Sequence, residues 1–294
     1  MKYTSLNQYL KNRFSTKVYK IALDGGFTCP NRDGTLGTRG CIFCSKGGSG
    51  DFAENRELSI YDQIEQGKRK VAGKIKDGKY IAYFQAFTNT YASVDRLESL
   101  YMQAIEHEDI VALSIGTRPD CLDDNVIELL ERLNKIKPIF VELGLQTIHE
   151  NTAKYIRRGY ELSVYDDAVR RLHKAGLNVV THLIIGLPNE TKNDMLKSVE
   201  YVCRVTDGIK LQLLHILKGT DLEVQYNAGK IKTLTLDEYC DIICDCIKII
   251  PKNVVVHRLT GDGAKKDLIA PLWSADKKNV LNTLNKRINE IQEK

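Results

Sequence analysis

The chain has 294 residues, of which 43% are hydrophobic and 28% are charged, and its formal net charge is +5. A chain of this length can bury one large core or two small ones, and no run of about 18 apolar residues is present that could cross a membrane. The mild positive charge permits a polyanionic partner such as RNA without requiring one. The first residues lack an apolar leader segment, so we expect a cytoplasmic protein, in which eight cysteines serve more often as ligands or buried residues than as disulfides.

Strand-like and helix-like patterns alternate along most of the chain, after a polar lead-in over residues 1–16. Short apolar runs rich in β-branched and aromatic residues predict strands at 18–23, 80–84, 110–115, 140–145, 179–185 and 209–217. Amphipathic stretches predict helices at 59–76, 93–107, 123–136, 163–175 and 191–205. Six β/α repeats of this kind indicate an α/β fold whose parallel sheet curls into a full or partial (β/α) barrel of the TIM type.

The C-terminal part adds a helix at 235–249, a strand at 254–258 and an amphipathic helix from residue 276 onward. We find no Gly/Ser linker and no sequence repeat beyond the β/α alternation. The sequence therefore predicts an N-terminal extension over 1–16, one barrel domain over 17–263, and a C-terminal extension over 264–294.

Three cysteines follow the first predicted strand in a glycine-rich segment, Cys29, Cys41 and Cys44, with the spacing C-x11-C-x2-C. Thiolates on a loop that glycine lets bend closely suit a soft metal or an iron–sulfur cluster. A structural zinc site would use a fourth ligand nearby, and neither Cys nor His follows in the next several dozen residues. A zinc site completed from a distant part of the chain, or a disulfide with one spare thiol, remains an alternative.

Polar side chains mark the ends of the predicted strands, where the loops of a β/α barrel meet. Gln85 follows the second strand, and the third ends in the run G-T-R-P-D, in which Arg118 either binds a carboxylate or phosphate or pairs with Asp120. Glu142 and Gln146 share one face of the fourth strand, where a buried charge requires a partner or a function.

The next two strands continue this pattern of polar ends. His182 lies in the fifth strand, just before the run G-L-P-N-E-T that begins at Gly186. His215 lies near the end of the sixth strand, where a substrate would bind.

Taken together, these motifs resemble the radical S-adenosylmethionine (SAM) superfamily, and the wide first cysteine gap and the G-T-R-P-D run resemble the branch of the Elongator catalytic subunit. The resemblance implies that Cys29, Cys41 and Cys44 hold a [4Fe-4S] cluster whose free iron chelates SAM, with the usual aromatic residue, here Phe43, before the last cysteine. It also implies SAM contacts at Gln85, Gln146, Arg158, His182 and Gly186. The chain departs from the family at Gln85, because it lacks the G-G-E turn that usually binds the amino group of SAM.

The implied activity is reductive cleavage of SAM to a 5′-deoxyadenosyl radical, which abstracts hydrogen from a substrate held near Arg118, Glu142 and His215. Similarity to the Elongator branch suggests the wobble uridine of tRNA as substrate, with conversion of a carboxymethylaminomethyl to an aminomethyl group as one candidate reaction. It also implies a reducing partner of the flavodoxin or ferredoxin type. The alternatives are a radical SAM enzyme for a small metabolite, porphyrin or peptide, and a non-enzymatic metal- or Fe-S-containing RNA-binding protein.

The remaining cysteines permit two further interpretations. Cys121 would lie at the mouth of the barrel as a hydrogen donor, a covalent anchor or a small buried residue. A second metal site built from Cys203, Cys240, Cys244 and Cys246 is less expected than core packing, because isoleucines surround these residues in the sequence.

Overall fold

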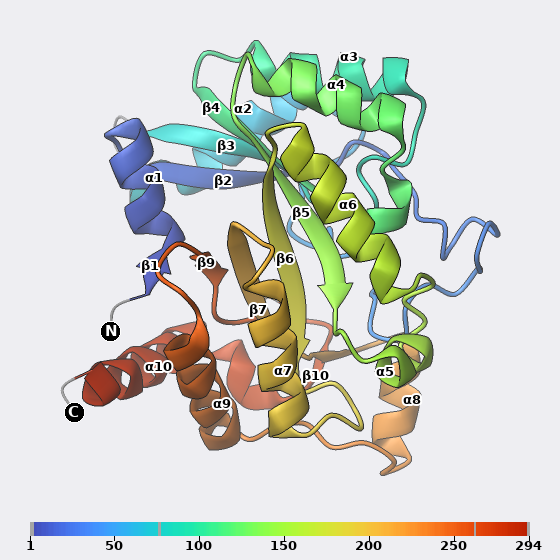
Figure 1. Cartoon of the computed structure of the whole chain (residues 1–294), viewed down its shortest axis with the longest axis vertical. Helices are drawn as coiled ribbons and strands as arrows, with labels where there is room; N and C mark the ends of the chain where they lie inside the picture. The colour runs from blue at the N-terminus through green and yellow to red at the C-terminus, as the bar shows by residue number, and fades with distance from the viewer. Residues whose placement is uncertain (1–2, 76–77, 262, 293–294) are drawn as a thin grey trace.

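The computed structural model describes residues 3–75, 78–261 and 263–292, and it shows one curled, parallel eight-stranded sheet with helices along its outer face (Figure 1). The strands lie in the order β1-β9-β7-β6-β5-β4-β3-β2. Their bounds are β1 Thr4–Ser5, β2 Val18–Leu23, β3 Lys79–Phe84, β4 Ile110–Thr117, β5 Ile139–Gln146, β6 Asn178–Ile185, β7 Gly208–Leu213 and β9 Val255–Arg258. Two further strands, β8 (Ile216–Leu217) and β10 (Leu268–Ala270), form a small antiparallel pair.

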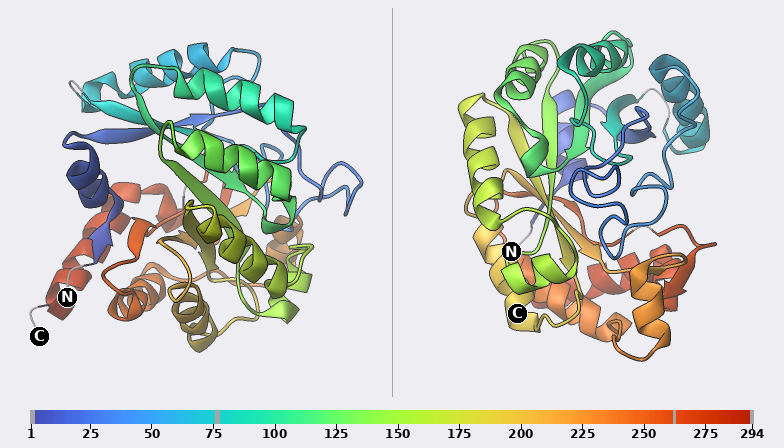
Figure 2. Two further views of the ribbon diagram at one scale, coloured as in Figure 1. Left: turned by 45° about the horizontal axis from the view of Figure 1, so that its top comes forward. Right: turned by 90° about the vertical axis from the view of Figure 1, so that its right-hand side faces the viewer.

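The helices that cross over between strands cover the outside of the sheet (Figure 2). The α-helices of the described residues, including those that do not cover the outer face, are α1 Leu6–Phe14, α2 Ile60–Val71, α3 Val94–Ile105, α4 Asp124–Asn134, α5 Glu150–Tyr155, α6 Leu162–Lys174, α7 Lys192–Val202, α8 Asp221–Asn227, α9 Leu236–Ile249 and α10 Lys277–Gln292. The main core lies between these helices and the outward strand residues, such as Leu113, Leu143 and Leu211. The predicted partial barrel is therefore confirmed. In the described part of the chain, no helix is long and apolar enough to span a bilayer.

Local sequence signals set the ends of several helices. Asp123 caps α4 by accepting a hydrogen bond from Val126 N, and Thr191 with Asp194 forms a capping box at the start of α7. Gly176 adopts a left-handed backbone with φ of 70° shortly after α6. Each of these signals lies within about one turn of the helix end that it sets.

Helix α1 closes the inner side of the sheet at the amino-terminal ends of the strands. Leu10 of this helix packs in a separate apolar cluster with Ile81, Ala112, Phe140 and Val180, which lie near the starts of β3 to β6. Because side chains alternate along a strand, Phe140 is followed on the same face by Glu142 and Gly144. The apolar cluster is thus the floor on which the polar interior of the barrel rests.

The sequence reading missed α1 and the short strand before it. β1 pairs in parallel with β9, with Thr4 opposite Val255, while β2 pairs with β3 at the other edge of the sheet. The segment that had been read as a polar lead-in therefore connects the two edges of the open barrel. The predicted strand over 209–217 is two elements, because the chain leaves the sheet after Leu213 and β8 then pairs with β10.

Candidate functional site

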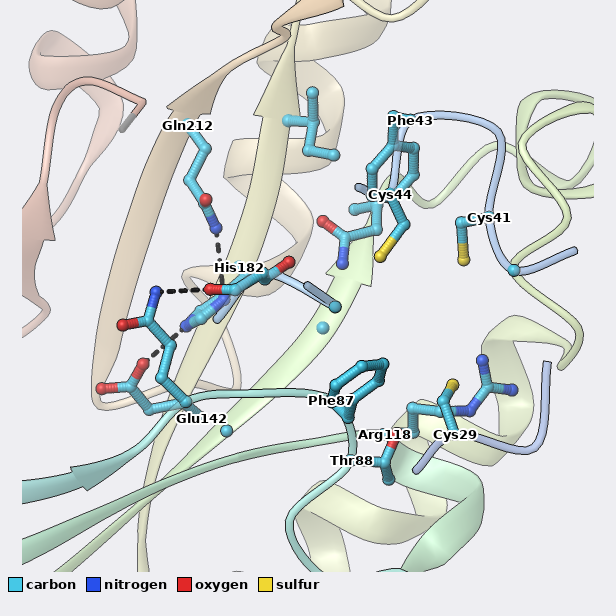
Figure 3. A pocket seen from close by; sticks show the side chains of 18 of the residues that line it. Cys29, Cys41, Phe43, Cys44, Phe87, Thr88, Arg118, Glu142, His182 and Gln212 are labelled. Carbon is cyan, nitrogen blue, oxygen red and sulfur yellow. Dashed lines mark hydrogen bonds and ion pairs between the residues drawn. The ribbon is translucent and has the colours of Figure 1, made fainter. Parts of the chain in front are cut away.

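The cysteine segment forms an irregular loop between β2 and α2 and covers the carboxyl ends of the strands. The carbonyl oxygen of Cys29 accepts hydrogen bonds from Arg32 N at 2.8 Å and Asp33 N at 3.2 Å, and Cys44 N donates to Cys41 O at 3.0 Å. All three cysteines are free of disulfides and line one cavity, which Figure 3 shows from close by. The three thiols that the sequence grouped together are therefore also grouped in space.

Polar groups surround these thiols. Asn31 Nδ2 donates to Cys41 Sγ at 3.4 Å and to the carbonyl oxygen of Arg157 at 2.8 Å, so one amide ties the loop to the turn after α5. Burial, with a smaller contribution from the neighbouring Cys44, raises the pKa of Cys41 to about 11, and the Asn31 hydrogen bond opposes the shift. Burial also raises the pKa of Cys44, against the influence of Arg32. Thiols of this kind become thiolates when a cationic centre binds them.

This donor set fits an iron–sulfur cluster. In the described part of the chain, no three Cys, His, Asp or Glu side chains are placed to hold one metal ion. A [4Fe-4S] cluster requires no such convergence, because each thiolate binds a different iron. The amide of Asn31 beside a cysteine sulfur is the kind of contact that tunes such a centre.

Below the cysteines, the interior of the barrel holds a buried carboxylate, Glu142 on β5. Its Oε1 accepts hydrogen bonds from Ser114 Oγ at 2.5 Å and from Lys20 Nζ, and its Oε2 accepts from His182 Nε2 at 2.8 Å and from Lys210 Nζ. The Glu142 side chain is fully buried, and those of Lys20 and Lys210 are 18% and 4% exposed. A single carboxylate thus neutralises part of the charge of two lysines that come from opposite parts of the sheet.

The environment shifts the pKa of each member of this group. Burial would raise the pKa of Glu142, but the two lysines and His182 outweigh it and hold that pKa well below its usual value. Burial lowers the pKa of Lys210 to about 7, although Glu142 opposes the shift. Burial and the nearby Lys210 lower the pKa of His182 to about 4. At neutral pH the imidazole is therefore uncharged.

The neutral His182 connects Glu142 to Gln212 and so fixes the orientation of the Gln212 amide at the cavity. Its Nε2 faces the Glu142 carboxylate and so carries the proton, which leaves Nδ1 to accept a hydrogen bond from Gln212 Nε2 at 3.2 Å. Figure 3 shows Gln212, His182 and Glu142 in a row on one side of the cavity and the three cysteines on the other. The strand β7 therefore presents a fixed amide to whatever occupies the space between them.

The two arginines that the sequence singled out are engaged within the protein. Arg118 binds the Asp120 carboxylate through Nε at 2.9 Å and Nη2 at 2.7 Å, and its Nη1 donates to the carbonyl oxygen of Arg158. Arg158 donates to the carbonyl oxygens of Tyr160 and Thr147 and to the Glu150 carboxylate. Both guanidinium groups lie over the Tyr160 ring. Of the two readings of Arg118, the structure shows the ion pair with Asp120.

Most of the other predicted site residues line the same cavity. Phe43, Gln146 and His215 contribute to its wall. Gln85 does so as well, and its side chain also donates to the carbonyl oxygen of Ser49 at 2.8 Å, which fastens the end of the cysteine loop to β3.

Gln146 and Gly186 need separate description, because one has an unusual backbone and the other lies outside the cavity lining. Gln146 has a left-handed backbone with φ of 71°, and a Cβ at Gly144 would lie 2.9 Å from Gln146 Nε2, so the side chain folds back over that glycine. Gly186 is not among the residues that line the cavity, and a Cβ there would approach Leu234 instead. Cys203, Cys240, Cys244 and Cys246 are buried in the main core, as expected. Cys121 differs from the expectation, because it is half-buried and lines a separate hollow instead of the main cavity.

Sequence reasoning missed the lysines of this site. A lysine is usually exposed, yet Lys20 lies mostly inside the protein, and the guanidinium of Arg158 is buried as well. The signal was available, because Lys20 and Lys210 interrupt apolar strands in the way that Glu142 does. Three ionisable residues on the inner faces of three predicted strands would have indicated a buried charge cluster.

Comparison with known proteins extends this description. A family model described as the Radical SAM superfamily matches residues 34–202, and one described as the Radical_SAM C-terminal domain matches residues 206–290. The chain is 47% identical over 288 residues to the uncharacterized protein YtqA of Bacillus subtilis. The aligned region covers 98% of this chain and 89% of YtqA.

Two further likenesses involve longer proteins. The chain is 30% identical over 164 residues to the tRNA uridine(34) acetyltransferase of Methanocaldococcus jannaschii, which covers 54% of this chain and 30% of that protein. The solved structure of the archaeal Methanocaldococcus infernus Elp3 with an N-terminal deletion has a TM-score of 0.67 at 18% identity. That likeness covers 94% of this chain and 63% of the Elp3 chain, and it shows a shared fold.

Proposed function

The chain belongs to the radical SAM superfamily, and from that premise we propose that Cys29, Cys41 and Cys44 hold the cluster beside a cavity that receives SAM and substrate. Enzymes of this family use a [4Fe-4S] cluster and SAM and require a reductant. The observation that carries the proposal is that the three thiols line the same cavity as the polar strand ends of the barrel. We further propose a flavodoxin- or ferredoxin-type protein as the electron donor.

When bound, the cluster and SAM supply one-electron reductive cleavage of SAM to a 5′-deoxyadenosyl radical. The residues of this chain would bind and orient SAM and the substrate and would shield the radical from water. The Glu142–His182–Gln212 row presents an amide of fixed direction, and Gln85 and Gln146 add polar groups around the same space. Phe43, Phe87 and Tyr160 line the cavity as well, and their rings limit the access of water.

For the substrate, we propose the wobble uridine of tRNA, with removal of the carboxymethyl part of a carboxymethylaminomethyl group as the candidate reaction. The support is the similarity to the tRNA uridine(34) acetyltransferase and the Elp3-like fold. The chain spans only 30% of that acetyltransferase, so its acetyl transfer is not carried over. Asp120 and the Arg158 carbonyl oxygen take three of the five N–H donors of Arg118, so we propose that another cation is the main partner of the substrate carboxylate.

The test is an anaerobic assay of the reconstituted, dithionite-reduced protein with SAM and bulk tRNA from a strain that lacks the modification. Mass spectrometry follows 5′-deoxyadenosine and the modified nucleosides. We expect both 5′-deoxyadenosine and a changed wobble uridine, and we expect Cys29→Ser, Cys41→Ser and Cys44→Ser to abolish both. Cys121→Ser is the matched control, because Cys121 lies outside the cavity lining.

Two other outcomes decide between the alternatives. If 5′-deoxyadenosine forms while the RNA stays unchanged, the radical SAM class stands, the tRNA proposal is weakened, and a small metabolite, porphyrin or peptide becomes the favoured substrate class. If Cys→Ser variants keep full cluster content, the assignment of the three ligands is wrong, whatever the activity.

A further inference from the structure

A second cavity opens on the side of the barrel, where β2 at one edge of the sheet faces β9 near the other edge. Its inner wall includes Lys20, Tyr83, Lys210, His257 and Arg258. Tyr83, Gln85, Lys210 and Arg258 also line the main cavity, so the two cavities meet at these side chains. None of the cysteines of the loop lines the side cavity, which therefore lies away from the cluster ligands.

The inner wall of this side cavity carries the basic residues Lys20, Lys210 and Arg258, whereas the carboxylate in its lining, Glu54, is paired with Lys70. Lys20 and Lys210 share Glu142, and both oxygens of Glu142 are already saturated by these lysines, Ser114 and His182. Each lysine also lies over the Tyr83 ring, with Nζ at 4.9 Å and 4.5 Å from its centre. Two buried amino groups thus share one carboxylate, and a second negative charge beside them would favour their ammonium forms.

A bulge in β9 adds a third polar group to this wall. Val256 pairs with Ile209, but Lys210 pairs with Arg258, so His257 is the extra residue of the strand. The bulge allows His257 and Arg258, which are consecutive, to line the side cavity together. His257 Nδ1 is buried, and the described structure shows no hydrogen-bond partner for it. A buried polar atom without a partner is costly, and a ligand can supply the missing one.

We infer that the side cavity binds a small anionic group of the substrate, a carboxylate in the first instance, through Lys210 with His257 and Arg258 around it. The inference rests on the proposed function and specifies it, because it places the acidic end of the substrate at the inner wall of the barrel. The anion is not that of SAM, since the side cavity contains none of the three cysteines near which SAM would bind. Lys20 contributes indirectly, because it binds Oε1 of Glu142. Lys210 lines both cavities and is therefore the lysine at their boundary.

The test compares the binding of two anticodon stem-loop RNAs to the anaerobic holoenzyme. One RNA carries 5-carboxymethylaminomethyluridine at the wobble position, and the other carries the methyl ester of the same group. We expect the acid to bind about tenfold to a hundredfold more tightly than the ester, as is typical of a charged hydrogen bond. In Lys210→Met this preference should fall to about one, while the affinity for the ester stays unchanged. Lys210→Arg should restore part of the preference.

The control is Lys248→Met, which removes a half-exposed lysine paired with Asp245 on α9 and should leave the preference as in the wild type. Equal affinities for acid and ester in the wild-type enzyme would overturn the inference, even if the RNA is converted to product.

A second measurement separates the inference from the tRNA proposal. The melting temperature of the holoenzyme is compared in acetate, inorganic phosphate and acetamide at matched ionic strength. We expect acetate to stabilise the wild type more than acetamide does, and this difference should vanish in Lys210→Met. If the RNAs do not bind but acetate stabilises, the anion site stands and the tRNA substrate fails. If acetate has no more effect than acetamide and the RNAs do not bind, the anion site is wrong, and a response to phosphate alone would change its ligand class.

Discussion

Glu142 on β5 and His182 on β6 are joined by a hydrogen bond of 2.8 Å between Oε2 and Nε2 deep inside the barrel. The bond fixes the protonated nitrogen of the imidazole and directs the other toward Gln212. It also couples the protonation of His182 to that of Lys20 and Lys210, because both lysines donate to the same carboxylate. The buried charges around Glu142 therefore determine the direction in which the Gln212 amide faces the cavity.

Replacing Glu142 with glutamine should destabilise the fold. The variant leaves Lys20 and Lys210 without a counter-charge in a buried position, and losing one partner of such a group costs about 3–5 kcal/mol of unfolding free energy. Urea unfolding followed by circular dichroism measures the loss. Glu200→Gln is the control, because Glu200 pairs with Arg204 on the surface and its loss should cost less than about 1 kcal/mol. Equal small losses in both variants would show that the buried lysines are not charged.

The stability of the protein should fall as the pH is lowered from about 6.5 to 4. The pKa of His182 is about 4 in the folded protein, whereas an unfolded histidine titrates near 6.5. Between these values the unfolded chain binds the proton first, so unfolding becomes easier by up to about 1.4 kcal/mol for each pH unit. The lowered pKa of Glu142 acts in the same direction at more acidic pH.

His182→Gln should flatten this pH dependence, and the exposed His173→Gln should not. The measurement is a series of urea midpoints between pH 4 and 7. An unchanged slope in His182→Gln would mean that the imidazole is charged in the folded protein.

Gly159→Ala should disturb the cysteine loop. Gly159 has φ of 85°, and an added Cβ would lie 2.8 Å from Asn31 Oδ1 and 3.3 Å from Arg118 Nη2. Gly229→Ala is a matched control, because Gly229 has φ of 68° but nothing within 4 Å of the added atom. Both variants should lose about 1 kcal/mol from backbone strain, and only Gly159→Ala should lose more and retain less iron after reconstitution. Equal losses of stability and iron would exclude the steric contact as the cause.

Asn31→Ala should lower the reduction potential of the reconstituted cluster. The variant removes the only described amide donor to Cys41 Sγ, and hydrogen bonds to ligand sulfurs stabilise the reduced form of such centres. Potentiometric titration monitored by electron paramagnetic resonance gives the value. Asn55→Ala, at an exposed position of the same loop, is the control. A potential that is the same in both variants would show that the amide does not reach the cluster.

Local patterns were sufficient to predict the barrel and the cysteine loop. Periodicity located β2 to β7 and their helices, and capping residues such as Asp123 and Thr191 located helix starts, because these signals depend on neighbours within one or two turns. The cysteines could be grouped because they lie within one loop. Glu142 was identified because a charge inside an apolar strand is unusual.

The parts that were missed depend on contacts between distant segments. Nothing near Lys20 in the sequence shows that its partner is Glu142, and nothing near Arg158 shows that its guanidinium is used by Thr147 and Glu150. The β9 bulge at His257 follows from pairing with β7, which the sequence of either strand does not specify alone. The role of α1 was missed because only Leu10 of the helix is buried, so its sequence carries little of the apolar periodicity that marks an amphipathic helix.

The pairing of Thr4 with Val255 has a consequence for how the protein is made. Of the strands that the structure describes, β1 is synthesised first, and it cannot pair with β9 until the segments up to residue 258 have followed it, because only β10, a short 3-10 helix and α10 come after β9. During synthesis the strands from β2 to β7 can pair in order with neighbours already present, whereas the N-terminal segment waits. Such a long-range pairing forms slowly, so completion of the sheet edge is expected to be a late step of folding. A nascent chain halted before residue 255 should therefore leave its N-terminus accessible to proteases, although most of the sheet has formed.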